Sequence, residues 1–226
     1  MYITLGGTHT HLLMPAPKIH SLLSSLATRR LIFHSEADFQ QALAWEFHLS
    51  NPDAQVRLAK QISEAGPREH LDLLVQLGGW EIAIELKYKT RLLKVNQAGE
   101  QYSLRNQSAQ DIGRHDFITD IGRLERYVKS RKNSEGIAVL LTNDQTYWKE
   151  SRKIDSIDTE FRIHEGRILH TSAAWGAKAA PGTTHKRDKP IQLFGKYELA
   201  WQNYSSLGPG PAHQFRYVLL HVASAA

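Results

Sequence analysis

The sequence contains no cysteine among its 226 residues. This absence excludes a disulfide framework, cysteine-based zinc sites and thiol catalysis. No run reaches the roughly 18 apolar residues that a membrane-spanning helix needs. Residues 1–7 (MYITLGG) also lack the basic, apolar and small-residue regions of a signal peptide. We therefore expect a cytoplasmic protein that has no membrane partner.

Other common signals are missing too. We find no internal repeat, no P-loop, no dinucleotide-binding fingerprint and no nucleophile elbow. Hydrophobic residues make up 41% of the chain, which contains 28 Lys and Arg residues and 23 Asp and Glu residues. This composition predicts a single globular domain over residues 1–226 with a mildly basic surface, which favours anionic partners and nucleic acid first.

Hydrophobic spacing predicts the elements along the chain. Ser35 is a predicted N-cap, because acids and an apolar stripe follow it. Residues 91–106 and 176–190 are predicted loops. Helices are predicted over about 18–29, 36–49 and 109–129, with another helical pattern that follows Pro52 and ends at Gly66-Pro67. Strands are predicted at 71–77, 80–88, 136–142, 197–201 and 215–222, the third of them at the centre of a sheet.

Gly78 and Gly79 predict a tight hairpin turn between the first two of these strands. With this turn, directly paired residues have numbers that sum to 157, so Asp72 is opposite Glu85. Two opposed carboxylates repel each other, and a divalent cation such as Mg²⁺ compensates that repulsion. Lys87 follows Glu85 by two residues and therefore lies on the same face of the strand. Paired carboxylates beside an ammonium group form a constellation suited to phosphoryl hydrolysis.

A plainer interpretation places these charges on the solvent face of an exposed hairpin. Asp72 and Glu85, however, both interrupt apolar runs that suggest burial on two faces. A buried acid requires a compensating partner. The sequence therefore favours a functional site over surface charge.

Asp72 followed by Glu85-Leu86-Lys87 resembles the signature of the PD-(D/E)XK nuclease superfamily. Leu71 stands where the signature has proline. The resemblance implies an α/β fold: a restriction-endonuclease-like core over about 18–145, with a mixed central β-sheet flanked by helices. A β-rich C-terminal extension would cover about 146–226. It also implies a metal-dependent nuclease acting on DNA, or, as the alternative, an inactive nucleic-acid-binding module of the same fold. A homodimer is compatible with both.

The resemblance also implies roles for individual residues. Asp72 and Glu85 would bind Mg²⁺ or Mn²⁺, with the backbone carbonyl of Leu86 as a further ligand. Lys87 would position water or stabilise charge in the transition state. Relatives add an acid from the helix before the hairpin, and the stripe position of Glu46 favours it over Glu36 for that role.

The predicted helix over 109–129 supplies candidate nucleic-acid contacts. Its apolar stripe extends backwards to Arg114 and Gln110, which would present a polar edge to phosphate. Gln107 or Gln110 would match a glutamine that some relatives place there, and Lys89 would extend a basic track. The alternative is that these polar residues simply cover the core.

Overall fold

The computed structural model describes residues 17–62 and 69–223 of the chain. Residues 1–7, on which the signal-peptide prediction depends, lie outside this part. The helices are α1 Pro17–Arg29, α2 Glu36–Ser50, α3 Gln110–Lys129 and α4 Pro181–Thr184, with a short 3-10 helix η1 at Thr159–Phe161. The strands are β1 Gln55–Gln61, β2 His70–Leu77, β3 Trp80–Lys89, β4 Leu93–Gln97, β5 Glu100–Leu104, β6 Ser134–Thr142, β7 Ile168–Ala173, β8 Ile191–Glu198, β9 Trp201–Ser206 and β10 Gln214–Val222.

Six strands form a mixed central sheet in the order β1-β2-β3-β6-β10-β9. β3 and β6 are parallel, and every other neighbouring pair in this sheet is antiparallel. All nine residues of β6 are buried. The apolar run at 136–142 therefore is a strand near the centre of the sheet, as its sequence predicts.

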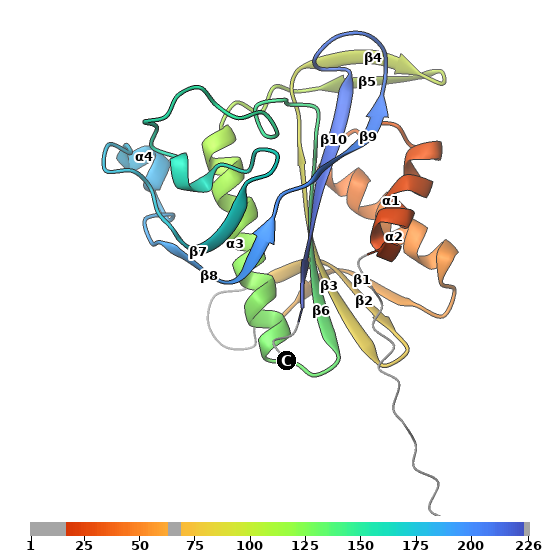
Figure 1. The fold of residues 1–226 in the computed structure, drawn as a ribbon. Helices are drawn as coiled ribbons and strands as arrows, with labels where there is room; N and C mark the ends of the chain where they lie inside the picture. Colours follow the sequence, from red (N-terminus) through yellow and green to blue (C-terminus); the bar gives the residue numbers. More distant parts are fainter. Residues whose placement is uncertain (1–16, 63–68, 224–226) are drawn as a thin grey trace, which may run out of the picture.

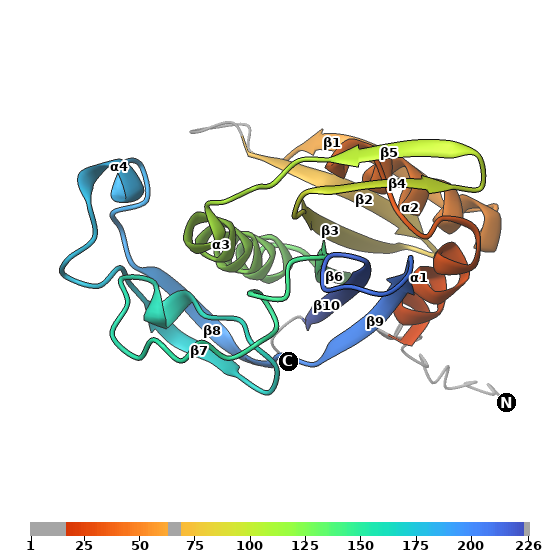
Figure 2. The same ribbon diagram turned by 90° about the horizontal axis from the view of Figure 1, so that it is seen from above.

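Helices cover both faces of this sheet (Figures 1 and 2). α1 and α2 lie on one face, where Phe33, Phe39 and Phe47 are fully buried. α3 lies on the other face and buries Phe117 and Ile121 against it. The protein is thus a mixed α/β structure in which a sheet separates two apolar cores.

The start of α2 agrees with the sequence. Ser35 accepts a hydrogen bond from the backbone N–H of Asp38 at 3.2 Å, as an N-cap residue does. This cap fixes the first residue of the helix, Glu36, next to the end of β3.

Two predicted elements are wrong. The helical pattern predicted after Pro52 is instead the edge strand β1, which pairs with β2 over Gln55–Gln61; its predicted end at Gly66-Pro67 lies outside the described residues. The predicted loop at 91–106 contains the hairpin β4–β5, which buries Leu93, Tyr102 and Leu104. At both places, strand pairing and side-chain burial outweighed the local preference of the sequence for a helix or a loop.

The C-terminal third also differs from the sequence prediction. β9 and β10 join the central sheet, so the core does not end near residue 145. β7 and β8 form a separate two-stranded sheet, and β8 contacts α3. The predicted strand at 197–201 is divided between the end of β8 and the start of β9. Among the described residues, no helix is both long and apolar enough to cross a membrane.

Candidate active site

The turn between β2 and β3 sets the register of the hairpin. Gly78 and Gly79 have φ values of +58° and +81°, which glycine adopts at low cost. Leu77 pairs with Trp80, and the pairing continues as far as Leu73 opposite Ile84. This is the predicted register, but it stops one residue short of Asp72 and Glu85.

Two carboxylates accept hydrogen bonds from the edge of β3 beyond the point where its pairing with β2 ends. Asp72 accepts the backbone N–H of Leu86 at 2.7 Å, and Glu36 accepts that of Tyr88 at 2.8 Å. Alternate N–H groups of a strand point to the same edge. Asp72 and Glu36 therefore replace the missing strand partner and are held on either side of Lys87 along the chain.

The neighbouring strand is distorted at the same level. Leu58 pairs with Leu73 and Lys60 with Leu71, so Ala59 is level with Asp72 without forming a ladder pair. Ala59 has a φ of +49°, a left-handed conformation that costs a non-glycine residue about 1 kcal/mol. Backbone strain of this kind is concentrated at functional sites.

Glu85 and Lys87 both face α3, which confirms that they share one face of β3. Arg123 donates to Glu85 at 2.7 Å and lies 3.2 Å from Asp120. The ammonium group of Lys87 is 2.5 Å from Asp120 and 3.4 Å from the carbonyl oxygen of Leu86. We call the six residues Glu36, Asp72, Glu85, Lys87, Asp120 and Arg123 the acidic cluster.

Acids outnumber cations in the acidic cluster, and the pKa values reflect this. Burial raises the pKa of Glu85 to about 8, the charges of Asp120 and Asp72 add to the rise, and Arg123 opposes it. Burial also raises the pKa of Asp120 against the charges of Lys87 and Arg123. Burial alone would lower the pKa of Lys87, but Asp120, Glu36 and Asp72 hold it above the ordinary lysine value. Perturbed groups gathered in this way are typical of functional sites.

The arrangement fits a divalent cation bound through oxygen. Asp72 is half-buried and Glu85 is 2% exposed, and the carbonyl of Leu86 directly follows Glu85 in the chain. Among the described residues, no three His, Asp or Glu side chains are grouped closely enough to hold a metal ion by themselves. Magnesium commonly binds to one or two carboxylates and completes its shell with water and substrate phosphate. The residues therefore fit an ion that binds together with a phosphate.

Glu46 lies elsewhere in the structure. Its carboxylate is buried and accepts a hydrogen bond from Arg29 of α1. Glu36 is ten residues earlier, which is about 15 Å along the helix axis. The apolar stripe of α2 packs against α1, whereas the N-terminus of α2 lies beside β3. Glu36, rather than the favoured Glu46, is the acid that α2 brings to the hairpin.

The predicted nucleic-acid contacts have structural roles in part. Arg114 is buried and donates to Asp158 at 2.6 Å and to the carbonyl of Thr146 at 2.8 Å. Gln110 donates to Asp144 at 2.9 Å. Gln107 is exposed, although its side chain accepts the N–H of Thr90 at 3.3 Å, and Lys89 is half-buried. Arg114 therefore is not a free phosphate ligand, because contact with phosphate would break a buried ion pair.

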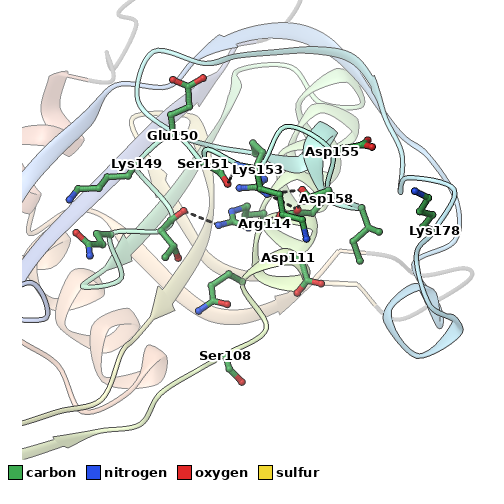
Figure 3. Close-up of a pocket in the computed structure, with 16 residues that line it drawn as sticks. Ser108, Asp111, Arg114, Lys149, Glu150, Ser151, Lys153, Asp155, Asp158 and Lys178 are labelled. Carbon is green, nitrogen blue, oxygen red and sulfur yellow. Dashed lines mark hydrogen bonds and ion pairs between the residues drawn. The ribbon is translucent and has the colours of Figure 1, made fainter.

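An open cleft of about 940 Å³ lies at the N-terminal end of α3 (Figure 3). Arg114, Lys149 and Lys153 line it, but so do Asp111 and Asp155. Asp72, Glu85 and Lys87 do not belong to its lining. This cleft and the acidic cluster are separate features that both border α3.

Sequence reasoning missed two members of the acidic cluster, Asp120 and Arg123. A signal for Asp120 was present, since it lies three residues after Phe117 and next to Ile121 of the apolar stripe, where it is 4% exposed. A charged residue beside a buried stripe requires a partner. The identity of that partner, Lys87, depended on how α3 crosses the sheet.

Protein-family models, curated proteins and solved structures give no match to this chain. The resemblance to the PD-(D/E)XK nucleases therefore stays a prediction. Function has to be argued from the acidic cluster itself.

Proposed function

We propose that this protein is a metal-dependent nuclease that hydrolyses phosphodiester bonds, with DNA as the expected substrate. The active site would be formed by Asp72, Glu85 and Lys87 on a restriction-endonuclease-like core. The observation that carries the proposal is the placement of four carboxylates beside Lys87 where β2 and β3 separate. Asp72 and Glu36 accept the backbone N–H groups of the residues before and after Lys87, Asp120 pairs with its ammonium group, and Glu85 pairs with Arg123.

The sheet order supports this assignment as well. A hairpin presents Asp72 and the Glu85-Leu86-Lys87 triplet, and its second strand runs parallel to β6. α2 and α3 reach the same point from opposite faces and contribute Glu36 and Asp120. The PD-(D/E)XK resemblance requires an acid on the first strand of a hairpin and an acid-x-Lys triplet on the second. This topology is compatible with that order.

Asp72 and Glu85 would hold Mg²⁺ or Mn²⁺, which would polarise the scissile phosphate and lower the pKa of a bound water. Lys87 would donate to the phosphate oxygens as negative charge develops on them. Asp120 orients the ammonium group of Lys87 through their 2.5 Å ion pair. Asp72 keeps its position because the N–H of Leu86 fixes one of its two oxygens.

One observation favours the alternative, an inactive nucleic-acid-binding module. Arg123 already donates to Glu85 at 2.7 Å, and a guanidinium group there neutralises a carboxylate that a metal would otherwise need. In the proposed enzyme, the ion and Arg123 would bind different oxygens of Glu85. In the alternative, the Arg123–Glu85 ion pair would be purely structural.

The test is cleavage of supercoiled plasmid, linear duplex and single-stranded DNA with Mg²⁺ or Mn²⁺. Asp72→Ala and Lys87→Ala should each lose activity by at least about 100-fold, the usual cost of removing a group that stabilises transition-state charge. Asp155→Ala and Lys132→Ala change exposed residues outside the acidic cluster and should retain activity.

The alternative predicts a different pattern. The wild type would bind DNA in EDTA, would not cleave it with either metal, and would show no metal-dependent rise in melting temperature. Equal cleavage by the wild type, Asp72→Ala and Lys87→Ala would refute the assignment of the site.

A further inference from the structure

A second open cleft, of about 660 Å³, lies between α3 and the segment that leads into β8. Its lining includes four cationic side chains, those of Arg126, Lys186, Arg187 and Lys189. Asp188 is the only acid in this lining within the described residues. We call this feature the basic cleft. Positive charge gathered in a cleft attracts polyanions.

The basic cleft borders the acidic cluster. Arg126 lines the cleft and pairs with Glu69 at 3.0 Å, three residues before Asp72. Arg123 of the acidic cluster precedes Arg126 by three residues, which is about 4.5 Å along the helix axis. A polymer lying in the basic cleft could therefore continue towards Asp72 and Glu85.

Two cations of the cleft are available to a ligand. Arg187 pairs with Asp116 at 3.0 Å, and Arg126 pairs with Glu69. Within the described chain, Lys186 and Lys189 form no ion pair, and both are exposed. Phosphate contacts from such lysines require little rearrangement.

An aromatic residue lines the same cleft. The side chain of Phe194 on β8 is 77% exposed. The backbone that carries it is held in place, because the N–H groups of Phe194 and Gly195 donate to the buried carboxylate of Glu125 at 3.0 and 2.7 Å, and the hydroxyl of Tyr197 donates to it at 2.7 Å. The ammonium group of Lys129 lies 5.2 Å from the ring centroid. An exposed aromatic ring on a well-held strand in a positively charged groove is the arrangement on which unpaired bases stack.

We propose that the basic cleft binds a single polynucleotide strand, with phosphates on Lys186 and Lys189 and an unpaired base stacked on Phe194. A paired base has its faces covered by its neighbours in the duplex, so a stacking platform favours single strands. The inference rests on the proposed function only in that the strand would lead to the acidic cluster; binding itself requires no cleavage.

The experiment measures the Kd of the full chain by fluorescence anisotropy in EDTA at several salt concentrations. The probes are a labelled 20-nucleotide single-stranded DNA, the RNA of the same sequence and the DNA duplex. Phe194→Ala should weaken single-strand binding about tenfold, since stacking of one base contributes that much, and should leave duplex binding unchanged. Phe194→Trp should restore single-strand binding.

A double variant tests the phosphate contacts. Lys186→Ala with Lys189→Ala should reduce the slope of log K against log salt by about 1.4, because each phosphate contact on a single strand contributes about 0.7. The matched controls are Lys149→Ala with Lys153→Ala in the other cleft, and Ile154→Ala, which removes a side chain that is 87% exposed. These controls should leave both the slope and the Kd unchanged.

The proposal is overturned if Phe194→Ala binds single strands as tightly as the wild type, or if the control variants lose as much affinity. The tighter of the DNA and RNA probes identifies the strand. Measurement in EDTA separates this inference from the proposed function, since cleavage would require the metal and strand binding does not. Strand binding that depends on Phe194 would support the basic cleft even in a protein that never cleaves DNA.

Discussion

Two groups of buried charge pack against α3 and differ in the sign that is in excess. In the first group, Asp158 accepts a hydrogen bond from Arg114 at 2.6 Å (Figure 3) and another from Arg162 at 3.0 Å. We call Arg114, Asp158 and Arg162 the arginine cluster. In the acidic cluster, Asp120 pairs with Lys87 and Arg123, Glu85 pairs with Arg123, and Asp72 and Glu36 accept backbone N–H groups beside Lys87.

The pKa shifts of the carboxyl groups follow this difference. Burial tends to raise the pKa of Asp158, but the hydrogen bond from Ser156 and the charges of Arg114 and Arg162 hold it below the usual range. In the acidic cluster the balance is reversed, and the pKa values of Glu85 and Asp120 are raised. The arginine cluster therefore has cations in excess of carboxylate, whereas the acidic cluster has carboxylates in excess of cations, an imbalance that a bound cation would relieve.

The largest expected change in the free energy of unfolding comes from breaking the Arg114–Asp158 ion pair of the arginine cluster. Asp158→Ala should lower the free energy of unfolding by about 3 kcal/mol, because it leaves the buried guanidinium of Arg114 without its partner. Urea denaturation measures this change. The double variant Arg114→Met with Asp158→Leu should recover most of the lost stability, since it removes both charges. A loss below about 1 kcal/mol for Asp158→Ala would contradict the structural role.

The acidic cluster should respond to pH in the opposite sense from an ordinary ion pair. The folded state holds the proton of Glu85 up to a pKa of about 8, whereas the unfolded chain loses it near the ordinary glutamate value. Wild-type stability should therefore fall between about pH 5 and pH 8 relative to Glu85→Gln, by up to about 1.4 kcal/mol per pH unit. Denaturation of both proteins across this range measures the difference. Asp120, Asp72 and Arg123 act on Glu85, and Lys87 pairs with Asp120; all four are present in both proteins, so their contributions largely cancel.

Added Mg²⁺ or Mn²⁺ should bind at the acidic cluster and not at the arginine cluster. Mg²⁺ or Mn²⁺ at ten times its Kd should stabilise the wild type by about 1.4 kcal/mol, a rise in Tm of about 3 to 5 °C for a chain of this size. Glu85→Gln should lose most of this shift. Asp155→Ala, near the arginine cluster, should keep all of it. An equal shift in all three proteins would place the ion elsewhere.

The smallest expected effect concerns the backbone beside Asp72. Ala59→Gly should change the free energy of unfolding by less than about 0.5 kcal/mol, because relief of the left-handed strain at a φ of +49° offsets the greater freedom of glycine in the unfolded chain. Ala59→Val should destabilise the protein by about 1 kcal/mol or more, since a branched side chain tolerates this conformation poorly. Thermal denaturation compares the two. Equal stability of both variants would show that Ala59 is not strained.

The local elements of the site could be predicted from the sequence. Gly78 and Gly79 determine the hairpin register, and strand alternation places Glu85 and Lys87 on one face. Ser35 and the acids after it determine where α2 begins. Each of these depends on residues close together in the chain, where turn geometry and capping leave few alternatives.

The partners of these residues could not be predicted in the same way. Glu36 and Glu46 lie on one helix, and only the packing of α2 decides that the first meets β3 and the second meets Arg29. Strand β1 and the hairpin β4–β5 were missed for a related reason, since their pairing depends on segments whose local preferences are weak.

The sequence by itself determined the hairpin, the capped helix and the order of acid, acid and lysine, because these follow from short-range geometry. The tertiary structure decided that β2 separates from β3 at Asp72, that Asp120 and Arg123 complete the acidic cluster, and that Phe194 lines a basic cleft. Those features arise where α3 crosses the sheet, and the crossing is set by burial of apolar surface summed over the whole chain rather than by any local pattern.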